Sequence, residues 1–180
     1  MTSAGRWAIG SGAVAVLVAT GAWARGPAGV DARLWAEVRP VIEARLVMES
    51  RGSGLGESMP ALDARWFCRA EALDLQERAG RVRAGVDTLC MEYGVRDGAL
   101  VECGGAQVPQ VVRLERAADG DYRVVSREEP PDGAGYAEWE ETHFSYDAES
   151  RLGGPVPSDA LETAARTHFG LPAGAPVEAC

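Results

Sequence analysis

The chain contains no lysine and no asparagine, and it has only two histidines and two isoleucines among its 180 residues. Every one of its 18 basic side chains is therefore an arginine. Because the depleted residue types share no chemistry, we interpret the pattern as a codon bias and give arginine less functional weight than usual. Acidic side chains number 27, and the formal net charge is −9. Nucleic acids and anionic membrane surfaces both require clustered positive charge, so neither is expected as a partner.

The motifs that identify common classes of site are also missing. No serine stands in a G-x-S-x-G pattern, which would indicate a hydrolase nucleophile. No two cysteines have the C-x-x-C spacing of a metal site, and neither histidine lies near a cysteine in the sequence. The glycine-rich segment 52–56 lacks the lysine and the preceding strand of a phosphate-binding loop. We therefore expect no metal and no cofactor, and we assign no catalytic residue.

The first 24 residues predict export. Arg6 precedes an uncharged run, residues 7–24, that ends in the small-residue pattern Ala22-Trp23-Ala24, as in a secretory signal peptide. Because about 18 to 20 apolar residues can cross a bilayer, an uncleaved N-terminal membrane anchor is the alternative. Glycine, serine and threonine dilute the run, so we favour cleavage after residue 24. Under either interpretation the rest of the chain is secreted or held at the cell surface.

Residues 25–170 have the usual length of a single domain. Apolar residues at helical spacing behind Asp31, a good N-cap, predict one long helix over residues 30–48. Pro40 falls inside this helix and predicts a kink or a second start. The glycine- and serine-rich segment 51–58 predicts a flexible loop, and the Pro- and Ala-rich segment 171–180 predicts a flexible tail.

From residue 65 the apolar period changes to two, which predicts a four-strand antiparallel sheet. Turn signals at 79–80, 97–98 and 119–120 separate the strands. Gly104 and Gly105 predict a bulge or bend that curls the sheet at mid-strand. Beyond the sheet, two short helices are expected, the second ending at Gly170. The expected strands are 65–75, 82–93, 99–103 continuing as 110–116, and 122–128, and the expected helices are 136–144 and 158–169.

Residues spread between positions 87 and 144 carry a resemblance to a known class of protein. They are Cys90, Glu92-Tyr93, Gly98-Ala99-Leu100, Gly105, Pro109, Val111-Val112, residues 129–133, Tyr136 and Phe144. Through them the chain resembles uncharacterised exported bacterial proteins of a cystatin-like or NTF2-like α+β class. The resemblance implies a long N-terminal helix across the concave face of a curled four-strand antiparallel sheet, with short C-terminal helices. It supplies no activity, and Gly104-Gly105 stands where it leads us to expect a serine and a glycine.

Four cysteines, Cys68, Cys90, Cys103 and Cys180, can form disulfides in an exported protein. Strand alternation places the first three on the face that points to the core, in one row across three strands. Folding the chain at residues 79–80 sets Cys68 opposite Cys90, so we favour that pair, with Cys103 free or bonded to Cys180. Buried thiols that pack as small apolar side chains are the alternative.

Candidate pocket residues are Trp66, Glu92, Tyr93, Trp139 and His143. Cone-shaped folds of the resembled class can host small-molecule enzymes with an ionisable residue in an apolar cavity, and Glu92 lies on the core-facing parity. Alternation points Asp87 outward. Glu140 and His143 are three residues apart and so could share a helix face as metal ligands, but a solvated helix face is the favoured interpretation. His168 is expected to pack on the apolar stripe of the last helix.

The sequence therefore favours a non-enzymatic exported module that binds on the concave side of the sheet. The expected partner is a protein, an envelope component or a small apolar ligand. An enzyme of the NTF2-like cone type is one alternative, with a buried ionisable residue such as Glu92 or His143. A secreted inhibitor is the other, using the loop 51–58. Contact with a membrane is expected only through residues 7–24, if they are not cleaved.

Overall fold

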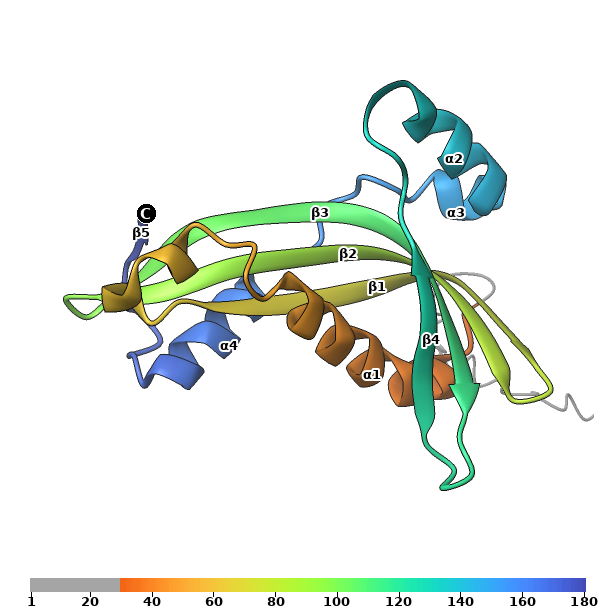
Figure 1. Cartoon of the computed structure of the whole chain (residues 1–180), viewed down its shortest axis with the longest axis horizontal. Coiled ribbons are helices and arrows are strands. Elements are labelled where there is room, and N and C mark those ends of the chain that lie inside the picture. The colour runs from red at the N-terminus through yellow and green to blue at the C-terminus, as the bar shows by residue number, and fades with distance from the viewer. Residues whose placement is uncertain (1–29) are drawn as a thin grey trace, which may run out of the picture.

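The computed structural model describes residues 30–180, so the predicted leader, residues 1–24, lies outside the described part. These residues form an α+β fold whose bent sheet has α1 on one side and α2 and α3 on the other (Figure 1). No helix among them is long and apolar enough to cross a membrane. The helices are α1 (Ala32–Ser50), α2 (Tyr136–His143), α3 (Tyr146–Glu149) and α4 (Asp159–Phe169), with short 3-10 turns η1 (Gly56–Ser58), η2 (Pro60–Leu62) and η3 (Gly133–Gly135). The strands are β1 (Arg65–Arg78), β2 (Arg81–Arg96), β3 (Ala99–Arg116), β4 (Tyr122–Glu128) and β5 (Val177–Ala179).

Within the described residues the sheet has five strands and is mixed, whereas the sequence predicts four antiparallel strands. Strands β1 to β4 form an antiparallel meander in chain order, and β5 pairs in parallel with Leu100–Glu102 of β3. Strand β3 is long enough to pair with both β4 and β5, because β5 uses its first residues and β4 uses its second half. Register shifts on β1, β2 and β3 mark bulges, and one of them places Cys103 opposite no residue, next to the predicted bend at Gly104.

Helix α1 begins where the sequence predicts. The Asp31 carboxylate accepts hydrogen bonds from the backbone amides of Arg33 and Leu34, at 2.8 and 2.9 Å. Pro40 does not interrupt the helix. It is exposed, and so is Ala36, whose carbonyl loses its amide partner on the solvent side. The apolar side of α1 packs on the sheet through Leu34, Val38, Ile42 and Leu46.

The opposite face of the sheet is covered by the C-terminal helices. Leu89 and Tyr93 of β2 pack with Leu161 and Ala165 of α4, in what we call the α4 cluster. Val86 and Cys90 of the same strand pack with the apolar side of α1. Because neighbouring side chains on a strand point to opposite faces, α1 and α4 pack on different faces. Helices α2 and α3 share the face of α4 and bury Phe144 there. The sheet is therefore sandwiched, and each face has its own pockets.

Two disulfides cross-link the fold. Cys68 bonds to Cys90, its direct partner across β1 and β2, which is the pairing that the sequence favours. Cys103 bonds to Cys180, one of the two arrangements left open for Cys103. The segment 171–180 is therefore not the frayed tail that its composition suggests, since it contains β5 and is covalently attached to β3. The proline-rich composition of this segment argues against a strand, and β5 forms only because it pairs with the distant strand β3.

Candidate functional site

A pocket of about 250 Å³ lies between α1 and the middle of the sheet. Helix α1 provides one wall, and strands β1, β2 and β3 provide its floor. This is the face on which the sequence predicts binding. We call it the α1 cavity, and it is lined by Leu46, Glu49, Ser50, Ser53, Trp66, Thr88, Cys90, Ala106, Val108, Gln110, Arg127 and Glu129.

Two buried polar atoms in the α1 cavity have no hydrogen-bond partner among residues 30–180. They are the indole Nε1 of Trp66, a donor, and Oε1 of Gln110, an acceptor on a side chain that is 4% exposed. An unsatisfied buried group of this kind costs about 1–3 kcal/mol. By contrast, the Thr88 hydroxyl is already used, because it donates to the Val108 carbonyl at 2.7 Å. Trp66 and Gln110 both line the cavity, and each carries one buried polar atom without a partner, a donor and an acceptor respectively.

The charged residues of the α1 cavity are bound to one another. Arg127 contacts the carboxylates of Glu49 and Glu129 at 2.8 and 2.7 Å. The two serines also use their hydroxyls locally, Ser50 on the Leu46 carbonyl and Ser53 on the Ser50 carbonyl. Because these groups satisfy each other, the cavity favours a neutral molecule over a free ion.

Glu92, a candidate pocket residue and the buried ionisable group of the enzyme alternative, anchors a loop. Its side chain is fully buried, and its two carboxylate oxygens accept hydrogen bonds from the backbone amides of Gly56 and Glu57, at 2.8 and 2.7 Å. A Cβ atom added at Gly54 would lie 2.2 Å from Glu92 Oε1, so only glycine allows this approach. The loop 51–58, predicted to be flexible from its composition, is thus held against the sheet by Glu92.

The five predicted pocket residues do not meet in one site. Only Trp66 lines the α1 cavity. Tyr93 lies on the opposite face in the α4 cluster, where burial raises the pKa of its hydroxyl. Trp139 and His143 stack on each other on α2, with ring centroids 4.3 Å apart. Trp66 and Glu92 are cross-strand partners on β1 and β2. Alternation along one strand does not tell which helix covers a given face, so it does not place Tyr93, Trp139 and His143 relative to them.

The possible metal pair on α2 is also separated. His143 Nε2 lies 3.5 Å from a carboxylate oxygen of Glu128, whereas Glu140 lines a different pocket on the same side of the sheet. No group of three His, Cys, Asp or Glu residues within 30–180 is arranged to hold a metal ion. His168 is exposed, and its ring lies edge-on to Phe67 and Phe169 at the border of the apolar stripe of α4.

The burial of Asp87 was not predicted from the sequence. Alternation points it away from α1, which is correct, but the segment that contains α2 and α3 covers that face. Asp87 is only 3% exposed, and burial raises the pKa of its carboxyl. The Gln107 side chain and the backbone amides of Gly153 and Thr88 oppose this shift. No local pattern in the sequence places the helix 136–143 above this strand, although residues of that helix line the same pocket as Asp87.

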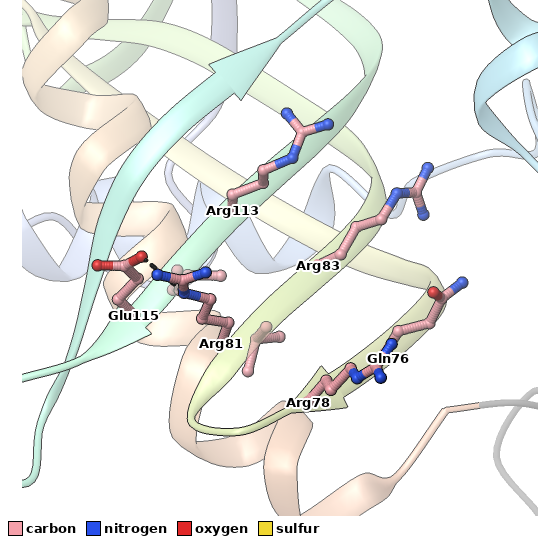
Figure 2. A pocket seen from close by; sticks show the side chains of 8 residues that line it. Gln76, Arg78, Arg81, Arg83, Arg113 and Glu115 are labelled. Atoms are coloured by element: carbon pink, nitrogen blue, oxygen red, sulfur yellow. Dashed lines mark ion pairs between the residues drawn. The ribbon is translucent and has the colours of Figure 1, made fainter.

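A third pocket, of about 400 Å³, lies on the sheet surface and contains four arginines (Figure 2). Three of them have acidic partners: Arg81 lies 3.1 Å from Glu115, Arg83 lies 2.9 Å from Asp74, and Arg113 pairs with Glu128. Figure 2 shows Arg83 and Arg113 side by side on neighbouring strands. Because its arginines are largely neutralised by these acids, we do not take this pocket as an anion site.

The chain matches no protein-family model, no curated protein and no solved structure. Its pockets and their polar atoms are therefore the basis for the function proposed below. Of the pockets described, the α1 cavity combines an apolar lining with an unused donor and an unused acceptor. Such a lining is typical of small-molecule sites.

Proposed function

We propose that the protein is an exported, non-enzymatic binding module that holds a small neutral molecule in the α1 cavity. One observation carries this proposal. Two residues that line the same mainly apolar pocket each have a buried polar atom without a hydrogen-bond partner, Trp66 Nε1 and Gln110 Oε1. A ligand with one hydrogen-bond acceptor and one donor, such as a small amide or alcohol with an apolar body, would satisfy both. The cavity volume lies just below the range of about 300–1,000 Å³ typical of drug-sized ligands, so the ligand is small.

Export is supported by two features. The leader sequence has the order of parts that secretion requires, and the two disulfides suit an oxidising compartment outside the cytoplasm. Disulfides are rare in the reducing cytoplasm. We therefore place the binding module outside the cytoplasm, either secreted or at the cell surface.

The cystatin-like or NTF2-like class is part of the same proposal. A long helix packs on one face of a bent meander, and a cavity lies between helix and sheet, as the resemblance implies. Catalysis of the cone type would need a free ionisable group in that cavity. The ionisable lining residues are Glu49, Arg127 and Glu129, and these pair with one another at the cavity. Binding without chemistry is therefore the favoured role.

The test is native mass spectrometry of the exported protein, followed by ligand release and identification. We expect the wild type to retain a small molecule. The retained amount should fall at least tenfold in Gln110→Leu, because this substitution removes the unpaired acceptor. Gln76→Leu, at an exposed position on β1, is the matched control and should retain the ligand. The proposal fails if the wild type carries nothing and a panel of small amides and alcohols leaves its tryptophan fluorescence unchanged.

A further inference from the structure

A cleft of about 530 Å³ lies on the opposite face of the sheet from α1, between strands β2 and β3 and the segment containing α2 and α3. Three carboxylates line it, one from β2, one from α2 and one from α3. We call it the acidic cleft. Its lining includes Asp87, Gln107, Tyr136, Glu140, Glu149 and Leu152.

Asp87 lies at the buried end of the acidic cleft. Its Oδ2 accepts a hydrogen bond from Gln107 Nε2 at 2.7 Å, and Gln107 also donates to the Gly154 carbonyl at 2.7 Å. The second carboxylate oxygen, Oδ1, is buried and has no hydrogen-bond partner of good geometry among residues 30–180. The backbone amides of Gly153 and Thr88 lie close enough to lower the pKa of the carboxyl without closing such a bond to Oδ1. A carboxylate that is 97% buried with one oxygen unused is a costly arrangement, which a ligand donor would relieve.

The acidic cleft lacks any compensating positive charge in the described part of the chain. None of Asp87, Glu140 and Glu149 has a basic group within 4.0 Å, whereas twelve other acids of the described residues are paired with an arginine. The nearby Arg151 is directed elsewhere, to the backbone carbonyls of Asp147 and Leu73. Burial raises the pKa of Glu140, and electrostatic repulsion from the carboxylates of Glu149 and Asp87 raises it further.

The geometry points to an organic cation. The three carboxylates do not form a group able to hold a metal ion. An alkyl ammonium or guanidinium is larger, carries several N–H donors and has an apolar stem. Tyr136 offers an aromatic ring for that cation, and Leu152 offers apolar surface for the stem.

We propose that the acidic cleft binds an ammonium or guanidinium group, with Asp87 Oδ1 as the buried acceptor and Glu140 and Glu149 as its flanking charges. The cation belongs either to a small free amine or to a lysine or arginine side chain of a partner protein. This second site is independent of the α1 cavity, because it uses the other face of the sheet.

The experiment titrates the folded, disulfide-bonded protein with putrescine, agmatine and a short arginine-containing peptide, by calorimetry at low ionic strength. We expect saturable binding of at least one probe, weakened at least tenfold by Asp87→Asn and by added salt. Asp97→Asn is the matched control, since it removes the same charge at an exposed turn, and it should change affinity less than twofold. A peptide that binds at least tenfold more tightly than agmatine indicates a partner protein, and similar affinities indicate a free amine.

A second variant keeps the proposal testable if Asp87→Asn does not fold. Glu140→Gln lies on the short helix at the side of the cleft and should weaken the same probes at least threefold. The proposal is overturned if no probe saturates below 10 mM, if Asp97→Asn weakens binding as much as Asp87→Asn, or if Ca²⁺ displaces the probes at equal concentration. A negative result at the acidic cleft would not change the ligand retention expected of the α1 cavity. The two proposals can therefore be tested separately.

Discussion

Asp87 and Thr88 are consecutive residues of β2, yet each lines a different pocket on a different face of the sheet. Asp87 faces the acidic cleft under α2 and α3, and Thr88 faces the α1 cavity. A single strand thus forms part of both candidate sites. A substitution at one position of β2 should therefore affect one candidate site and leave the other unchanged.

Replacing Gln110 by leucine should stabilise the ligand-free protein. The substitution removes a buried acceptor that has no partner, and the expected gain in the free energy of unfolding is about 1–3 kcal/mol. Gln76→Leu, at an exposed position, should stay within about 0.5 kcal/mol of the wild type. Urea denaturation measures both. Destabilisation by Gln110→Leu would mean that the amide has a bonding role in the free protein.

Removing the disulfide between Cys68 and Cys90, by alanine at both positions, should lower the free energy of unfolding by about 3 kcal/mol. The bond closes a loop with a sequence separation of 22 residues, and the chain-entropy model predicts a loss of that size. Denaturation of the double variant, with mass spectrometry to verify that Cys103 and Cys180 stay bonded, gives the value. A loss below about 1 kcal/mol would show that the unfolded chain gains little freedom.

Gly54→Ala should disrupt the loop that Glu92 anchors. The added Cβ would lie 2.2 Å from the Glu92 carboxylate, which cannot move away without losing the amides of Gly56 and Glu57. We expect a loss of about 2–4 kcal/mol, because a buried charge loses its hydrogen bonds. Gly104→Ala is the control, since a Cβ there meets nothing within 4 Å. Thermal unfolding of the two variants should differ clearly, and equal melting temperatures would contradict the anchoring role.

The stability contributed at Asp87 should depend on pH in a defined direction. Burial raises its pKa above the ordinary value of 3.8, so the folded state binds a proton more tightly than the unfolded chain does. Stability at this site is therefore greatest at low pH and falls as the pH rises from 3.8 through the raised pKa. Asp87→Asn should stabilise the protein relative to the wild type at pH 7, and this gain should shrink towards pH 4. Denaturation curves across that range test it, and a gain that grows on acidification would contradict it.

The local features of this fold were readable from sequence because they depend on neighbouring residues. Asp31 caps the helix that follows it, and Cys68 faces Cys90 because the intervening turn fixes the strand register. The end of the last helix at Gly170 follows from that residue's left-handed backbone, with φ of 66°. In each case a short segment determines its own geometry.

The features that the sequence did not reveal depend on contacts between distant segments. Strand β5 exists because residue 177 pairs with residue 100, and its own composition argues against a strand. Asp87 is buried because a segment some fifty residues later covers it. Alternation correctly assigned Asp87 to the face away from α1, but whether that face is solvated depends on packing that no local pattern encodes. The positions of the candidate pocket residues depend on packing in the same way, since Tyr93 lies with α4, Trp139 and His143 lie on α2, and only Trp66 and Glu92 are neighbours across the sheet.

The glycine-rich loop carries its own counter-charge. The amides of Gly52 and Gly54 donate to the Glu57 carboxylate, and those of Gly56 and Glu57 donate to Glu92. Backbone N–H groups can bind anions in other proteins, but here the four amides are divided between the carboxylates of Glu57 and Glu92. Because carboxylates of the same chain already accept hydrogen bonds from these four amides, the amides are not free to bind an external anion. A nucleotide or phosphate ester would have to evict two carboxylates before it could enter.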